Sequence, residues 1–128
     1  MSTNYLLAFN DHFMEFVGDI QSVFPEDHDL LVAKNSFLAI RKANPKIIVR
    51  IWNIYIINKY KKQIENGDIS FFLEKDYSQD VSNAEYSDKI MEAINRLRGP
   101  IKSMSQESQE KTMKYIQNLS KLAALVGN

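Results

Sequence analysis

The stretch NPKIIVRIWNIYIINKYKKQIENG, residues 44–67, decides the fold. Its isoleucine-rich run lies between Asn44-Pro45 and Asn66-Gly67, and such pairs typically begin and end helices. Apolar residues surround nearly the whole helical wheel, a pattern typical of a helix at the centre of a bundle. We therefore expect a central helix at about residues 45–65 with Trp52 in the core. A buried strand is the alternative, since isoleucine also favours strands.

Helical periodicity predicts two helices before this segment. Phe9, Phe13 and Phe16 share one apolar stripe, which Pro25 ends. Asp27 is a candidate N-cap for the second helix. Its inward residues are Leu30, Ala33, Phe37 and Ile40.

The pattern after the central stretch predicts shorter elements and then two more helices. Asp68 is a candidate cap for a short helix through Phe71, Phe72 and Leu73, and 76–83 reads as a polar connecting loop. A helix from about Tyr86 is expected to end at Gly99-Pro100, and the last helix follows Ser103 or Ser105. We expect an all-α chain, a compact bundle of five or six helices forming a single domain over residues 1–128.

Composition excludes several classes of protein. Of the 128 residues, 45% are hydrophobic, which excludes disorder over the whole length. The chain has no cysteine, so it has neither a disulfide framework nor a thiolate site, as is typical of a reducing intracellular compartment. Neither a signal peptide nor an apolar run of about 18 residues is visible, so no transmembrane segment is expected.

Charge is segregated although the formal net charge is zero. No acidic residue occurs from Leu30 to Ile64, where the chain carries eight basic residues. This block could attract phosphate or an acidic protein, or its charges could pair with acidic helices of the same bundle. The polyanion-binding candidates are Arg41, Lys42, Lys46, Arg50, Lys59, Lys61 and Lys62.

The central helix also carries a candidate protein interface. Ile57 falls within its otherwise polar stripe, where an exposed apolar residue can belong to a contact surface. An isolated surface isoleucine is the simpler alternative. The candidate interface residues are Lys46, Arg50, Asn53, Ile57 and Lys61.

Motifs for chemistry are absent. His12, Glu15 and Asp19 share one helical flank, but a closed metal site needs further ligands and a solvated helix face explains these residues better. The four glycines form no phosphate-binding cluster, and no serine has a nucleophile-elbow context. We predict no catalytic residue, no metal site and no cofactor.

Three stretches resemble short helical proteins encoded by giant nucleocytoplasmic DNA viruses of algae and other protists. They are FNDHFMEFVGDIQSVFP (9–25), IRKANPKIIVRIWNIYIINKYKKQIENGDISFFLEKDY (40–77) and IMEAINRLRGPIK (90–102). Twelve lysines against four arginines also fit AT-rich coding DNA. The resemblance implies a location in the host cytoplasm or virus factory, with packaging in the virion as a further expectation, and it assigns no activity to any residue.

These observations predict a non-enzymatic helical interaction protein with a role in viral assembly, in the virion or in regulation. Its expected partner is another protein or a second copy of the chain. Backbone-directed nucleic-acid binding through the basic block 34–62 is the alternative. An enzyme whose site is assembled from distant helices is the third hypothesis.

Overall fold

A computed structural model of the chain describes residues 2–74 and 87–127. Its elements are α1 (Ser2–Val23), α2 (His28–Ala43), α3 (Ile47–Ile51), η1 (Trp52–Ile57), α4 (Asn58–Glu65), α5 (Ser70–Glu74), α6 (Ser87–Lys102) and α7 (Gln106–Val126). Because α3, η1 and α4 follow without a break, they form one continuous helix, and the described residues then contain six helices and no strand. The all-α bundle predicted from the sequence is confirmed. The predicted loop 76–83 and helix start at Tyr86 lie outside the described residues.

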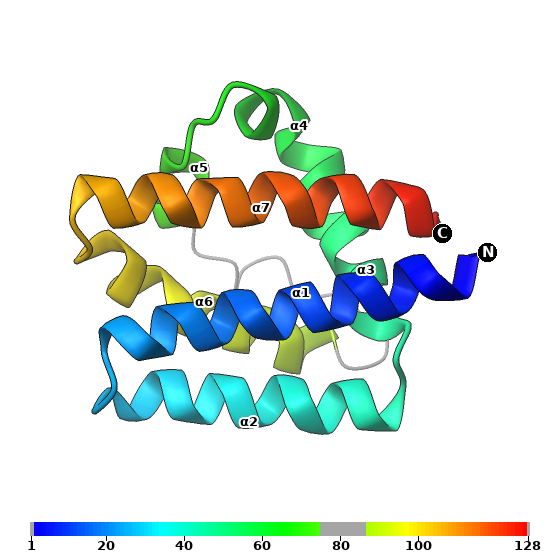
Figure 1. Cartoon of the computed structure of the whole chain (residues 1–128), viewed down its shortest axis with the longest axis horizontal. Coiled ribbons are helices and arrows are strands. Elements are labelled where there is room, and N and C mark those ends of the chain that lie inside the picture. The colour runs from blue at the N-terminus through cyan, green and yellow to red at the C-terminus, as the bar shows by residue number, and fades with distance from the viewer. Residues whose placement is uncertain (1, 75–86, 128) are drawn as a thin grey trace.

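The long helices α1, α2 and α7 lie side by side in one layer, with their axes nearly parallel (Figure 1). In Figure 1, α1 lies between α7 and α2, with α6 behind them and both chain ends on the same side. The continuous helix crosses behind α1 and α7, so that α3 lies near the end of α2 and α4 rises beyond α7. Buried residues from the described helices form one apolar cluster, which joins these elements into a single core.

Aromatic residues dominate the centre of that core. Trp52 is 1% exposed and lies edge-on to Phe9 and Phe13, with ring centroids 6.3 and 5.9 Å away. Phe13 also meets Phe37 edge-on at 4.7 Å. The indole Nε1 of Trp52 donates to the hydroxyl of Ser120 at 3.2 Å, so its buried polar group has a partner. The prediction that Trp52 is a core residue is confirmed.

Local sequence fixes most helix ends as predicted. The carboxylate of Asp27 accepts from the backbone N–H of Leu30 at 3.1 Å, and Ser105 accepts from that of Ser108 at 3.2 Å. Gly67, with φ of 72°, ends α4, where its N–H and that of the next residue bond back to the last turn. Asp68 accepts from the backbone N–H of Ser70 at the start of α5.

One predicted helix end is wrong. The helix α6 continues through Gly99-Pro100 to Lys102. A proline in a helix removes one hydrogen bond, to the carbonyl four residues earlier, and the loss is tolerated best in a terminal turn. Here the N–H of Ser103 bonds to the carbonyls of Gly99 and Pro100, both at 3.1 Å, so the last turn closes beyond the proline.

The middle of the central helix differs from the uniform helix that we expected. Residues Trp52–Ile57 form a π-helix, and the N–H of Asn58 bonds to the carbonyl of Asn53, five residues earlier. A second departure follows at Tyr60, whose φ of −127° and ψ of 26° kink α4. Each residue of a π-helix turns through a smaller angle than in an α-helix, so the side chains that follow point in different directions from those of a uniform α-helix.

Candidate interaction surface

The residues of the predicted interface on the central helix differ in exposure. Lys46 and Arg50 are exposed at the start of α3, and Lys61 is exposed on α4. Asn53 is half-buried, and its Nδ2 donates to the carbonyl of Ala123 in α7 at 3.5 Å. Ile57 is half-buried and packs against the core, so the expectation that it is an exposed apolar residue is wrong.

The π-helical turn explains this difference. In a uniform α-helix, Arg50 and Ile57 would lie on the same side. The π-helical turn changes the direction of the residues that follow it, and Ile57 therefore points inward. Ile54 takes the outward position instead and is 42% exposed. Ile54 is four residues after Arg50 and therefore lies near the same side even at α-helical spacing, but that spacing gives no signal for the inward direction of Ile57.

Within the described ranges, an ion pair joins the basic block to an acid at Arg41. Arg41 is half-buried and meets the carboxylate of Asp11 at 2.6 Å. Lys59 has its Nζ 5.7 Å from the ring centroid of Tyr55. The other basic residues of the block form no ion pair within 4 Å to an acid in the described ranges; they are Lys34, Lys42, Lys46, Arg50, Lys61 and Lys62. Intramolecular pairing therefore leaves most of this positive charge uncompensated at close range.

The polyanion candidates fall into two groups. One group consists of Arg41, Lys42, Lys46 and Arg50 around the turn between α2 and α3, and the other of Lys59, Lys61 and Lys62 on α4. Figure 1 places α2 and α4 on opposite sides of the α1–α7 pair. All except Arg41 are exposed, so both groups are accessible to a partner.

A groove of about 420 Å³ lies beside the first group, between α1 and α2. Its lining residues are Leu6, Leu7, Asn10, Leu38, Arg41, Lys42 and Pro45. Leu7 is 56% exposed and Leu38 is 44% exposed. Asn10 donates its Nδ2 to the carbonyl of Pro45 at 2.9 Å, which ties α1 to the turn that follows α2. The groove and its exposed leucines were not predicted from the sequence, although Arg41 and Lys42 were named as polyanion candidates.

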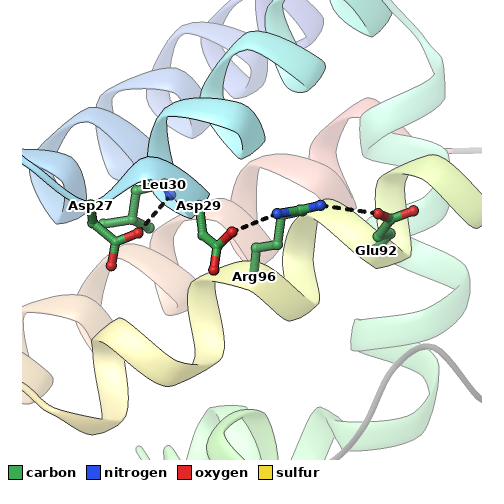
Figure 2. A network of polar contacts seen from close by, with 5 residues as sticks. All are labelled: Asp27, Asp29, Leu30, Glu92 and Arg96. Atoms are coloured by element: carbon green, nitrogen blue, oxygen red, sulfur yellow. Dashed lines mark hydrogen bonds and ion pairs between the residues drawn. The ribbon is translucent and has the colours of Figure 1, made fainter.

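An ion pair connects the acidic start of α2 to α6. Figure 2 shows Arg96 between two carboxylates, that of Asp29 at 2.7 Å and that of Glu92 at 3.3 Å. Nearby, Asp27 caps the helix through Leu30. A groove of about 360 Å³ between α2 and α6 is lined by small side chains together with Lys89, Glu92 and Arg96. Glu92 and Arg96 bind each other, so these two titratable groups of the groove are paired.

The side chains of His12, Glu15 and Asp19 contact different partners. The Nδ1 of His12 lies 3.9 Å from Glu15, whereas Asp19 meets Lys111 at 3.3 Å. Tyr115 donates its hydroxyl to Glu15 at 3.2 Å. Burial, with the nearby charges of Asp19 and Glu15, raises the pKa of Tyr115 to about 12. Within the described ranges no group of three or more His, Cys, Asp or Glu side chains is placed to hold a metal ion.

Comparisons with known proteins add no relative from which a role could be transferred. No family model, no curated protein and no solved structure matches the chain. In the described part of the chain, no helix has both the length and the apolar character needed to cross a membrane.

Proposed function

We propose that this chain is a non-enzymatic interaction protein that binds an acidic protein partner through the basic surface at the α2–α3 turn. One observation carries the proposal: Lys42, Lys46 and Arg50 are exposed and meet no described acid, and Lys42 lines the groove that also holds Leu7 and Leu38. Surfaces that combine apolar area with uncompensated charge are suited to charge-complementary protein partners. A structural role for these charges within the bundle would require nearby acids.

We also propose a viral setting for this interaction, in assembly, in the virion or in regulation. The support is the resemblance of 9–25, 40–77 and 90–102 to proteins of giant DNA viruses, together with the excess of lysine over arginine. The corresponding location is the host cytoplasm or the virus factory.

Nucleic-acid binding is the second candidate, since the same exposed cations could contact phosphates. The net charge of zero favours a protein partner, because a dedicated nucleic-acid binder typically carries a basic excess. Trp52 and Tyr55 are buried and therefore offer no stacking platform for bases.

Crosslinking followed by affinity capture from cells that express the tagged chain tests this function. We expect the wild type to retain a protein that resists nuclease treatment and is lost when Lys42, Lys46 and Arg50 are replaced by glutamine. The matched control replaces Lys111, Lys114 and Lys121 on α7 with glutamine and should retain the partner. Capture that nuclease abolishes, or that the α2–α3 substitutions leave unchanged, would contradict the proposal.

A further inference from the structure

The outer face of the α1–α2 pair is apolar along much of its length. On α2, Leu31 and Leu38 are seven residues apart and each is 44% exposed, so they lie on one side of the helix. On α1, Leu7 lies across the groove from Leu38, and Met14 follows on the same side, half-buried. We define the α1–α2 face by these four residues and Gly18. Amphipathic helices commonly bind to a groove that is lined by such a row of apolar side chains.

The ion pair between Asp11 and Arg41 fixes how the two helices align. Seven residues make nearly two turns, so Gly18 on α1 and Lys34 on α2 lie on the same sides of their helices as that pair. Because the helices are antiparallel, Gly18 is then level with Lys34 (Figure 1). The face thus continues from the groove at Leu7 and Leu38 toward the middle of both helices.

Gly18 has no role within the chain that requires glycine. It lies inside the 22-residue helix α1, where glycine destabilises a helix relative to alanine, and its φ is not positive. A Cβ at this position would meet nothing within 4 Å, so no neighbouring element within the described chain presses against it. A glycine on an outer helix face does allow the backbone of a second helix to approach closely.

The charges of the face select the kind of partner. Arg41 is paired with Asp11, whereas Lys34 and Lys42 on the α2 side of the face meet no described acid. On the α1 side, Asp11 and Glu15 are both exposed. A second copy that used the same face would bring the same two unpaired lysines to the contact. An amphipathic helix with an acidic flank toward α2 would place its carboxylates against these lysines and its apolar side against the leucines.

We infer that the α1–α2 face is the docking site for an amphipathic helix of a partner protein, which runs along the groove with an acidic flank toward α2 and passes beside Gly18. This inference rests on the proposed interaction function and names its surface and the chemistry of its partner. The docked helix would lie between Leu7 and Leu38 at one end and approach Leu31 at the other.

A designed peptide tests this site directly. It has about 18 residues, enough to span α2 at 1.5 Å per residue, with leucines on one side and glutamates on the flank that faces α2. A control peptide carries lysine in place of every glutamate. Anisotropy of the labelled peptides measures affinity, and backbone amide NMR shifts of the protein locate the contact. We expect the acidic peptide to shift Leu7, Gly18 and Leu38 and to bind at least tenfold more tightly than the control.

Matched variants distinguish binding at the groove from nonspecific binding to exposed apolar side chains. Leu38→Asp and Leu7→Asp should each weaken the acidic peptide at least tenfold, whereas Leu125→Asp on α7 should not, although Leu125 is as exposed as Leu7 at 56%. Gly18→Leu should keep or raise the melting temperature, since the site is open, yet weaken binding at least tenfold. Equal binding of the two peptides, an equal loss in Leu125→Asp, or tight binding by Gly18→Leu would overturn the inference.

Other outcomes distinguish this inference from the function on which it rests. Shifts confined to Lys46 and Arg50, unchanged by Leu38→Asp, would overturn the docking face and leave an acidic partner supported. Self-association of the wild type that Leu38→Asp abolishes would overturn the choice of partner, because the occupant would then be a second copy.

Discussion

At the scale of single residues, burial is set mainly by side-chain chemistry and helical spacing. The sequence alone could therefore place Trp52, Phe13 and Phe37 in the core, where the structure finds them in edge-on contact. It could not place Ile57, since its direction depends on the π-helical turn before it. It also gave no reason for Gly18, which only the open space around its Cα distinguishes from an ordinary helix position.

Replacing Trp52 with alanine should be severely destabilising. The side chain is fully buried among Phe9 and Phe13, and its loss leaves a large void in the core. We expect the free energy of unfolding to fall by about 3–5 kcal/mol. Thermal or urea unfolding measures this, with Ile54→Ala on the exposed side of the same helix as the control. An unchanged midpoint for Trp52→Ala would show that the central helix is misplaced.

Replacing Gly18 with alanine should stabilise the chain. The position is helical and open, so alanine fits without strain, and we expect a gain of about 0.5–1 kcal/mol in the free energy of unfolding. Gly67→Ala is the opposite case, because its φ of 72° is left-handed and should cost about 1–2 kcal/mol. Denaturant unfolding of both variants checks the contrast. A loss of stability in Gly18→Ala would mean that a neighbour already occupies the space beside α1.

At the scale of helices, the signals that the sequence carries are local. Asp27, Ser105 and Gly67 could be recognised because a cap bonds to backbone groups within a few residues. The end of α6 was predicted at Gly99-Pro100 because a proline usually ends a helix, but hydrogen bonds of Ser103 close the turn beyond it. The π-helical segment was missed because it is a property of packing around Trp52 and Tyr55 and not of any local motif.

The cap of α7 offers a test at this scale. Ser105 is the only described side chain that accepts from the N–H of Ser108, so Ser105→Ala should lower the free energy of unfolding by about 1 kcal/mol. Ser105→Asp should retain most of that stability, since aspartate also accepts from the first turn. Chemical unfolding of the two variants, measured side by side, checks this. Equal stability of the alanine and aspartate variants would argue against the cap.

At the scale of the whole molecule, the arrangement of charge could be predicted only in part. The acid-free block from Leu30 to Ile64 is visible in the sequence, but whether its lysines pair within the bundle is not. The structure pairs Arg41 with Asp11 and leaves Lys42, Lys46 and Arg50 exposed. The α1–α2 groove beside them was not predicted, because it needs the register of two helices as well as the pattern of each.

The central claim is that the basic surface serves a protein partner and not nucleic acid. Anisotropy titration of labelled mixed-sequence DNA and RNA at about 50 mM salt, where electrostatic binding is strong, tests it most directly. A variant with Lys42, Lys46, Arg50 and Lys61 replaced by glutamine should keep the fold and serves as the comparison. We predict no saturable binding by the wild type, because its net charge is zero and it lacks the basic excess of a nucleic-acid binder. Saturable binding that weakens with salt, and that shows a shallower salt dependence in the variant, would contradict the account.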